Sequence, residues 1–272
     1  MDIPYSARII ADSIAPCERR LITAVMTYPR MVHSELMTHR ALSRNSSSSR
    51  AMPVHAMMHQ VVRQPAEPAW WGANQRGMQA HAELLGWRRR LAEALFYGAR
   101  WPALGAAWTL MKLGLHKQLA NRLLEPWAYI TVVVSATDLD NLFSLRCHPD
   151  AQPEIRRAVE SLRSAVAAST PRRLRAGEWH LPFVTDEERS SLSSGTLIKL
   201  SVARCARVSY LTHDGKRDPE RDVQLHDQLL QSRHLSPFEH VAQALDWPVR
   251  HGNFTGFKQA RKDIPGEAGE AA

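Results

Sequence analysis

The sequence predicts an α+β fold in which a mixed or antiparallel sheet packs against long helices. Two β-prone runs lie within the first 30 residues, and a third apolar run, residues 128–135, is typical of a buried strand. Three longer segments have the composition or the apolar stripe of helices: residues 78–97, 103–125 and 153–168. At 272 residues the chain is long enough for one large or two small domains.

The N-terminal half begins with an expected hairpin. Residues 7–14 and 21–29 are predicted strands, separated by a turn that contains Pro and Cys. A helical pattern follows over residues 31–42. We expect the serine-rich residues 43–50 to form a loop, because Ser and Asn side chains compete for the backbone hydrogen bonds of a helix. A second loop, residues 65–77, contains two adjacent tryptophans.

The C-terminal half has a weaker pattern. Residues 169–200 show little periodicity and are expected to be an irregular insertion. A strand is predicted over residues 200–210, followed by a polar turn at Asp214 and Gly215. A helix is predicted to begin at Asp218, an N-cap followed by Pro, and to run to about Arg233.

Composition excludes several classes of protein. With 44% apolar residues the chain is not a disordered one, and no stretch reaches the ~18 apolar residues that span a bilayer. The N-terminus lacks the pattern of a secretory signal, and 3 scattered cysteines form no disulfide framework, so we expect a cytoplasmic protein. The net charge of +8 favours an anionic partner, either nucleic acid or a phosphorylated small molecule.

A first polar cluster surrounds the serine block. Glu35 and His39 are four residues apart and would share a helix face. The segment from Arg40 to Arg50 then offers hydroxyl, amide and guanidinium donors, which can surround a phosphate. The alternative is a flexible surface loop without a ligand.

A second polar cluster follows the apolar run of residues 128–135. Asn141, Arg146, His148 and Asp150 lie between this predicted strand and the next helix, where an anion site is plausible. Asp150 could equally serve only to stabilise the start of that helix.

A third cluster contains two histidines and a glutamate between His234 and His240, but its spacing matches no common zinc motif. We therefore expect no metal and interpret this segment as a polar turn. Neither a nucleophile elbow, a Rossmann glycine motif nor a P-loop occurs.

These clusters resemble the motifs of the flavin-dependent thymidylate synthases. THRALSRNSSSSR, from Thr38 to Arg50, fits the signature R-H-R-x-x-S-x-N-x-x-S-x-R at every fixed position except the first. NLFSLRCHPDAQPEI, from Asn141 to Ile155, resembles a second block of the family, with Asp150 where histidine is usual. ARVSY, ending at Tyr210, and SPFEH, beginning at Ser236, resemble a strand and a turn of the family.

The order of these blocks is rotated. In the family the SPFEH-like block comes before the serine-rich signature, whereas here it follows near the C-terminus, as in a circularly permuted relative. We expect a single catalytic domain over residues 1–262, with insertions at about 54–110 and 169–200 that have no counterpart in the family. A disordered tail is expected over residues 263–272.

The resemblance implies reductive methylation of dUMP at C5. Methylenetetrahydrofolate would supply the carbon, FAD the hydride and NADPH the reducing equivalents, in a homotetramer whose active sites are shared between chains. Alternatives are hydroxymethylation of dUMP or C5 modification of another pyrimidine nucleotide. The rival from another class is a basic protein that binds nucleic acid without catalysis, which we consider unlikely because no binding module is recognisable.

The resemblance also assigns roles to residues. Arg146 would contact the uracil and help to ionise N3. The residues implied for dUMP are Glu35, Ser46, Ser47, Ser48, Ser49, Arg50, Arg122 and Arg146. The residues implied for FAD are Thr38, His39, Arg40, Asn45, Ser135, Thr137, Asn141 and Ser236.

Four of these positions depart from the family. Thr38 and Thr137 replace arginines, Ser46 stands where glutamate is usual, and Glu35 stands where glutamine is usual. We expect that Lys258 and Arg261 could supply the missing positive charge near Thr38 if the chain folds back there.

Overall fold

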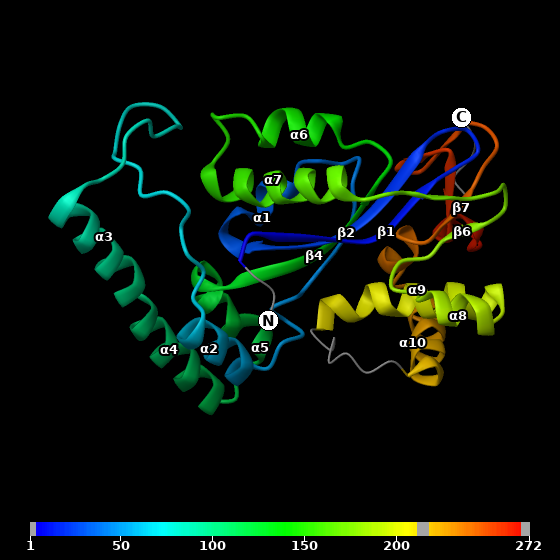
Figure 1. Ribbon diagram of the computed structural model, residues 1–272. Helices are drawn as coiled ribbons and strands as arrows, with labels where there is room; N and C mark the ends of the chain where they lie inside the picture. The colour runs from blue at the N-terminus through cyan, green and yellow to red at the C-terminus, as the bar shows by residue number, and fades with distance from the viewer. Residues whose placement is uncertain (1–3, 211–217, 268–272) are drawn as a thin grey trace.

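The computed structural model describes residues 4–210 and 218–267, and a five-stranded sheet forms its centre (Figure 1). The strand order is β3-β4-β2-β1-β5. Neighbouring strands are antiparallel except β1 and β5, which are parallel, so the predicted α+β fold with a mixed sheet is confirmed. The strands are β1 (Ser6–Ile14), β2 (Arg20–Pro29), β3 (Ser43–Ser46), β4 (Tyr129–Ala136) and β5 (Arg172–Arg173).

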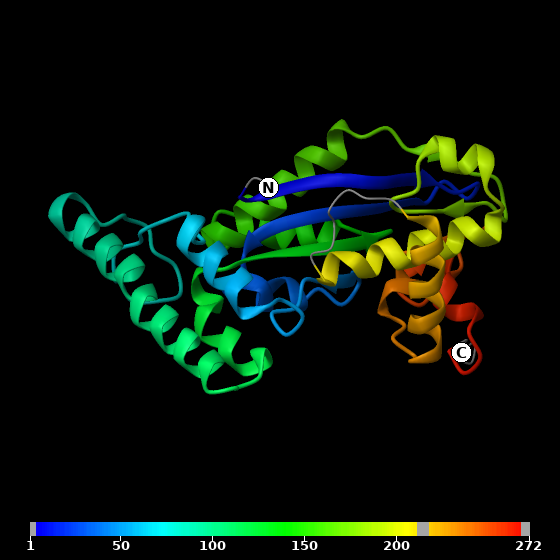
Figure 2. The ribbon, with the colours of Figure 1, turned by 90° about the horizontal axis from the view of Figure 1, so that it is seen from below.

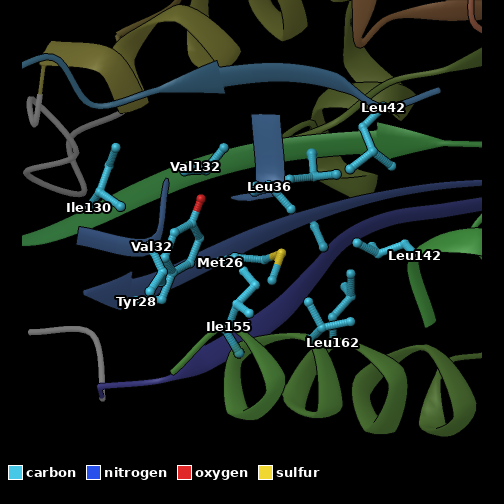
Figure 3. Packing of buried hydrophobic residues seen from close by; sticks show 14 of the residues in the cluster. Met26, Tyr28, Val32, Leu36, Leu42, Ile130, Val132, Leu142, Ile155 and Leu162 are labelled. Carbon is cyan, nitrogen blue, oxygen red and sulfur yellow. The ribbon is translucent and has the colours of Figure 1, made fainter. Parts of the chain in front are cut away.

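The main core lies between one face of this sheet and the helices α1, α6 and α7. Alternate residues of β2 and β4 point to this face, because side chains of a strand alternate between its two sides. Figure 3 shows them packed against the helices, with buried side chains from Met26, Tyr28, Ile130, Val132, Leu36, Ile155 and Leu162. The helices are α1 (His33–Met37), α6 (Asp140–Arg146) and α7 (Pro153–Ala168), with the short 3-10 helix η1 (Arg30–Val32) before α1.

A group of helices extends from one end of the sheet. It comprises α2 (Val54–Arg63), α3 (Gly86–Gly98), α4 (Arg100–Lys112), α5 (Lys117–Ala120) and η2 (Asn121–Trp127). Figures 1 and 2 show α3 and α4 projecting from the body, and we call them the helical arm. The predicted helix over residues 103–125 is interrupted after α4, where Gly114 adopts a φ of 82° that ends a helix easily.

The C-terminal region packs against the opposite face of the sheet and its far end (Figure 1). A small sheet has the order β10-β7-β6, and β8 pairs with β9. The elements are β6 (Trp179–His180), α8 (Asp186–Ser191), α9 (Ser194–Tyr210), α10 (Pro219–Gln231), η3 (Ser236–Glu239), β7 (Ala242–Ala244), β8 (Arg250–His251), β9 (Phe254–Thr255), β10 (Phe257–Gln259) and η4 (Ala260–Asp263).

Most predicted elements are confirmed: the hairpin β1–β2, the strand β4, the helix α7, and α10 with Asp218 as its N-cap. The strand predicted over residues 200–210 is wrong, because this segment is the second half of α9. The irregular segment of residues 169–200 contains α8 and the start of α9. The expected turn at Asp214 and Gly215 lies outside the described residues.

The serine block is also different from the expected loop. Its first half is the edge strand β3, which pairs with β4, and the helix before it ends already at Met37. Within residues 4–210 and 218–267, no helix has both the length and the apolar character needed to cross a membrane.

Candidate active site

Arg146 is the centre of a hydrogen-bonded cluster that joins α6 to α1. As the last residue of α6, it donates from Nη1 to Glu35 Oε2 at 2.6 Å and from Nε to His39 Nε2 at 3.0 Å. Its Nη2 donates to the Glu35 carbonyl at 3.3 Å and to Thr38 Oγ1 at 3.2 Å. Four residues predicted for the site, from two motifs separated by about 100 residues, therefore meet in one place.

His39 in this cluster is held as a neutral imidazole. Its pKa is lowered by burial first, and then by the positive charges of Arg146 and Arg44. Because the ring accepts from Arg146 through Nε2, the proton of the neutral form belongs on Nδ1. Arg44 stabilises the same turn, because its Nη1 donates to the carbonyls of Leu36, Met37 and His39.

The cluster borders a cavity of about 680 Å³, which we call the Arg146 cavity. Glu35 and Arg146 form one side of it, and the connection between α6 and α7 continues this side. Residues of the loop 68–84, including Trp70 and Trp71, also line it. This volume is in the range of small-molecule sites.

The serine block lines a different cavity, of about 420 Å³, which we call the serine cavity. Ser46, Ser48 and Arg50 face it, together with Arg44, Asn45, Ala51, Gln118, His234 and Ser236. Ser47 and Ser49 are buried instead: the hydroxyl of Ser47 accepts from the Thr131 amide at 3.1 Å, and the carbonyl of Ser49 accepts from Asn121 at 2.7 Å.

The SPFEH block returns to the serine block in space. Ser236 Oγ donates to Asn45 Oδ1 at 3.4 Å, although the two residues are 191 positions apart. Gln259 Nε2 joins the same two segments by donating to Ser43 Oγ at 2.9 Å and to the Glu239 carbonyl at 3.0 Å. The rotated order of motifs is therefore compatible with a local assembly of the blocks.

Within the part of the chain that the structure describes, the serine cavity and the Arg146 cavity share no lining residue. Arg122 is half-exposed, lines neither cavity and pairs with Glu125 at 2.9 Å. Arg40 and Asn141 are exposed to solvent, and Thr137 Oγ1 accepts from the Thr255 amide. The roles assigned to these residues stay predictions.

Ser135 belongs to a buried polar chain that the sequence did not reveal. Its hydroxyl lies 2.6 Å from Thr23 Oγ1 and 2.8 Å from His240 Nδ1. Thr23 also contacts His180 Nε2 at 2.8 Å, and His180 Nδ1 lies 2.8 Å from Ser13 Oγ. The only sequence signal was the presence of Ser and Thr residues within the two apolar strands β2 and β4.

Both histidines of this chain are neutral. Complete burial lowers the pKa of His180 to about 3 and that of His240 to about 3. Nε2 of His240 is buried without a hydrogen-bond partner among the described residues.

The expected compensation by Lys258 and Arg261 is wrong. Arg261 Nε donates to Glu267 at 2.8 Å, and its Nη1 bonds to Glu239. Lys258 bonds to Asp263. Both charges are thus used within the C-terminal segment, and Thr38 takes its hydrogen bond from Arg146 instead.

Metal binding and a thiol nucleophile at Cys147 are not supported by the described residues. In the described ranges, no group of three or more His, Cys, Asp or Glu side chains is placed to hold a metal ion. Burial raises the pKa of the Cys147 thiol, which disfavours the nucleophilic thiolate.

Comparison with known families agrees with this fold and with the placement of the motifs. The model of the Thy1 family, the thymidylate synthase complementing proteins, matches residues 13–172, which include Glu35, the serine block and Arg146. The chain belongs to this family, which is the flavin-dependent thymidylate synthase family that its motifs resemble.

Two solved structures of a UMP/dUMP methylase, PolB from Streptomyces cacaoi, are among the similar folds. The complex with 5-Br dUMP has a TM-score of 0.45 and 21% identity, over 56% of this chain and 69% of the other. The complex with 5-Br UMP has a TM-score of 0.46 and 16% identity, over 60% of this chain and 88% of the other. A search of curated proteins found no match.

Proposed function

We propose that this protein is an enzyme that methylates dUMP at C5, with methylenetetrahydrofolate as the carbon donor and FAD and NADPH as the source of reducing equivalents. The observation that carries the proposal is the Arg146 cluster. In a chain of this family, it places a fixed guanidinium at the border of a cavity of suitable size.

Arg146 would bind the uracil ring and stabilise negative charge on it. Ionisation of N3 makes C5 more nucleophilic, and a cation held beside the ring lowers the free energy of that anion. The guanidinium is held by three residues before any substrate arrives, so little reorganisation accompanies the reaction.

The charges of the two cavities differ in a way that suits a nucleotide. The Arg146 cavity has three carboxylates, Glu35, Asp150 and Glu154, which disfavour a phosphate dianion. The serine cavity has Arg44, Arg50 and several hydroxyls, and none of the described residues that line it is acidic. We assign the base to the first cavity and the phosphate to the second.

Two separate cavities in one chain can serve one substrate if chains associate. This supports the homotetramer with shared sites, in which Arg146 of one subunit meets the serine block of another. The helical arm supports association as well, because it exposes large apolar side chains that a monomer rarely leaves in water: Trp87 is 70% exposed and Leu95 65%.

The residues assigned to FAD fit an anionic cofactor in part. Asn45 and Ser236 border the serine cavity, where amide, hydroxyl and guanidinium groups could bind phosphate oxygens. When bound, FAD would supply the hydride that reduces the transferred carbon, and NADPH would reduce FAD again. Ser135 would act only indirectly, because its hydroxyl is buried between Thr23 and His240.

The test is to incubate the protein with dUMP, methylenetetrahydrofolate, FAD and NADPH and to determine the mass of the product. A methyl product supports the proposal, and a hydroxymethyl product redirects it to the sister reaction. Replacement of Arg146 by Ala should abolish turnover while bound flavin, measured by its absorbance, is retained. Full turnover by Arg146→Ala would contradict the role of this residue.

A further inference from the structure

The loop of residues 66–84 forms a wall of the Arg146 cavity, and it belongs to the insertion for which the family motifs offer no counterpart. It lies between α2 and α3, beside the N-terminal end of α7 (Figure 1). Trp70, Trp71, Gly72 and Met78 to His81 all face the cavity. A segment that lies in the sequence between the two family motifs, and belongs to neither, therefore completes the cavity that contains Arg146.

The loop is fixed at its base by contacts with two elements, η2 and α7. The amide of Ala66 donates to the Trp127 carbonyl at 2.8 Å, and the amide of Ala69 donates to Glu154 Oε1 at 2.7 Å. Glu154 is itself 4% exposed, so this bond anchors the loop to the buried start of α7. A loop held in this way can present a side chain in a constant position.

The two tryptophans have different surroundings. Trp71 is fixed edge-on against Phe96 at 5.7 Å between ring centroids, and its backbone bonds to Glu83 and Leu84. Trp70 is 39% exposed and borders the cavity. It lies close to Gly72, where an added Cβ would come within 3.2 Å of Trp70 Cδ1 and 2.3 Å of Ala80 Cβ. Because Gly72 has no side chain, the indole of Trp70 can occupy this space.

We propose that Trp70 is a substrate-binding residue. The pyrimidine ring of the nucleotide stacks on its indole, and Arg146 and Glu35 form hydrogen bonds with the polar edge of the ring. A flat heterocycle is the class of ligand that uses both groups, because an indole binds a π-face and a guanidinium with a carboxylate binds donors and acceptors in the ring plane. This inference rests on the proposed function.

The experiment measures binding by calorimetry to the full, flavin-loaded chain. Two probes are compared: dUMP, and deoxyribose 5-phosphate, which has no base. Loss of one base–aromatic stack weakens binding by about 5- to 100-fold. We therefore expect Trp70→Ala to weaken dUMP binding by this factor and to leave deoxyribose 5-phosphate unaffected, while Trp70→Phe restores dUMP affinity to within about threefold.

The matched control is Trp247→Ala, since Trp247 is 74% exposed, lies outside the helical arm and does not line the cavity. It should bind dUMP as the unmodified protein does. If Trp70→Ala fails to fold, judged by circular dichroism, Trp70→Leu takes its place, because Leu keeps apolar bulk without a π-face.

The outcomes separate this inference from the proposed function. Unchanged dUMP affinity in a folded Trp70→Ala or Trp70→Leu variant overturns the stacking role and leaves the proposed function intact. Equal weakening of both probes also overturns it, because the effect is then not on the base. A chain that binds no dUMP at all overturns the proposed function and this inference together.

Discussion

Glu35 is the residue on which the position of Arg146 most depends. Its carboxylate accepts from Nη1 at 2.6 Å, and its carbonyl accepts from Nη2. Both side chains are largely shielded from solvent, at 19% and 26% exposure, so this charged hydrogen bond is only partly screened. Glu35 therefore acts as a positioning residue for the guanidinium as well as a predicted contact of the nucleotide.

Substitutions of Glu35 test whether it positions the guanidinium of Arg146. Glu35→Ala removes a charged hydrogen bond worth about 1.5–3 kcal/mol, so we expect kcat/KM for dUMP to fall by at least about tenfold. Glu35→Gln keeps an acceptor for Nη1 and should recover most of this loss. Steady-state kinetics at several dUMP concentrations would measure kcat/KM for both variants. A Glu35→Ala variant with unchanged kcat/KM would contradict the positioning role.

Three histidines with a lowered pKa, of which His180 and His240 are fully buried and His33 is partly buried, connect single residues to the pH dependence of stability. Burial lowers the pKa of His33 to about 4 and the pKa values of His180 and His240 to about 3. In the unfolded chain these groups titrate near pH 6.5. Between about pH 6.5 and pH 3 the unfolded chain therefore binds protons that the folded chain does not, and the free energy of unfolding falls as the pH falls.

The expected slope is on the order of 1 kcal/mol per pH unit for each histidine. Urea unfolding at pH 7.5, 6.0 and 5.0 measures it. His180→Gln removes one of the titrating groups and should make the slope shallower, even if stability at pH 7.5 is lower. His59→Gln on the exposed face of α2 is the control. An identical slope in His180→Gln and the unmodified chain would disprove the contribution of His180.

At the scale of elements, α9 depends on an ion cluster that holds it to α8 and α10. Arg204 is 4% exposed and donates to Glu188 on α8 and to Asp222 on α10 at 2.6 to 2.8 Å. Arg207 donates to the other oxygen of Asp222 at 2.7 Å. Because these charges are buried, each needs its partner.

Breaking this cluster should therefore be costly. Asp222→Asn leaves Arg204 and Arg207 without a carboxylate between them, and we expect a loss of about 3–5 kcal/mol in the free energy of unfolding. The neighbouring pair of Lys199 and Asp227, at 2.9 Å, is largely exposed. Asp227→Asn should cost no more than about 1 kcal/mol. Urea unfolding measures the free energy of unfolding of both variants. Comparable losses would contradict the larger contribution of the buried ion cluster.

The same helix could not be predicted from its sequence pattern. The helix α7 was predictable because only one side of it is buried and carries an apolar stripe. The strand β2, which is buried on both faces, was predictable from its run of β-prone residues. α9 is buried on nearly all sides between Leu200 and Val208, so it has no helical period and its valines resemble those of a strand.

The edge strand β3 escaped prediction for the opposite reason. Its four residues are polar, and they form a strand because their backbone pairs with β4, which is remote in sequence. The cluster of Glu35, His39 and Arg146 was foreseen from motifs. The buried histidines were not, because nothing near them in sequence indicates that Thr23 and Ser135 lie between them.

At the scale of the whole molecule, the separation of the two cavities is the main feature that the proposed function must accommodate. The serine block lies at the sheet edge beside α9 and η3, whereas Arg146 is the last residue of α6, one of the helices that cover the other face. Under the proposed function, a nucleotide that contacts both cavities binds where two subunits meet. The rotated motif order does not depend on this, because Ser236 contacts Asn45 within one chain.

Subunit mixing tests this directly. Arg146→Ala and Arg50→Ala should each be inactive, because one lacks the cation at the base and the other lacks the proposed phosphate ligand. If each site combines Arg146 of one subunit with Arg50 of another, random mixing in equal amounts restores both residues to about a quarter of the sites.

The two variants are coexpressed with different tags, the mixed oligomers are isolated, and activity is compared with the unmodified enzyme. A mixture of Arg146→Ala with the double variant Arg146→Ala, Arg50→Ala is the control and should stay inactive. Mixed oligomers that form and yet show no activity would mean that one chain builds the whole site, and the two cavities would then have to join by a movement of α1 and β3 within that chain.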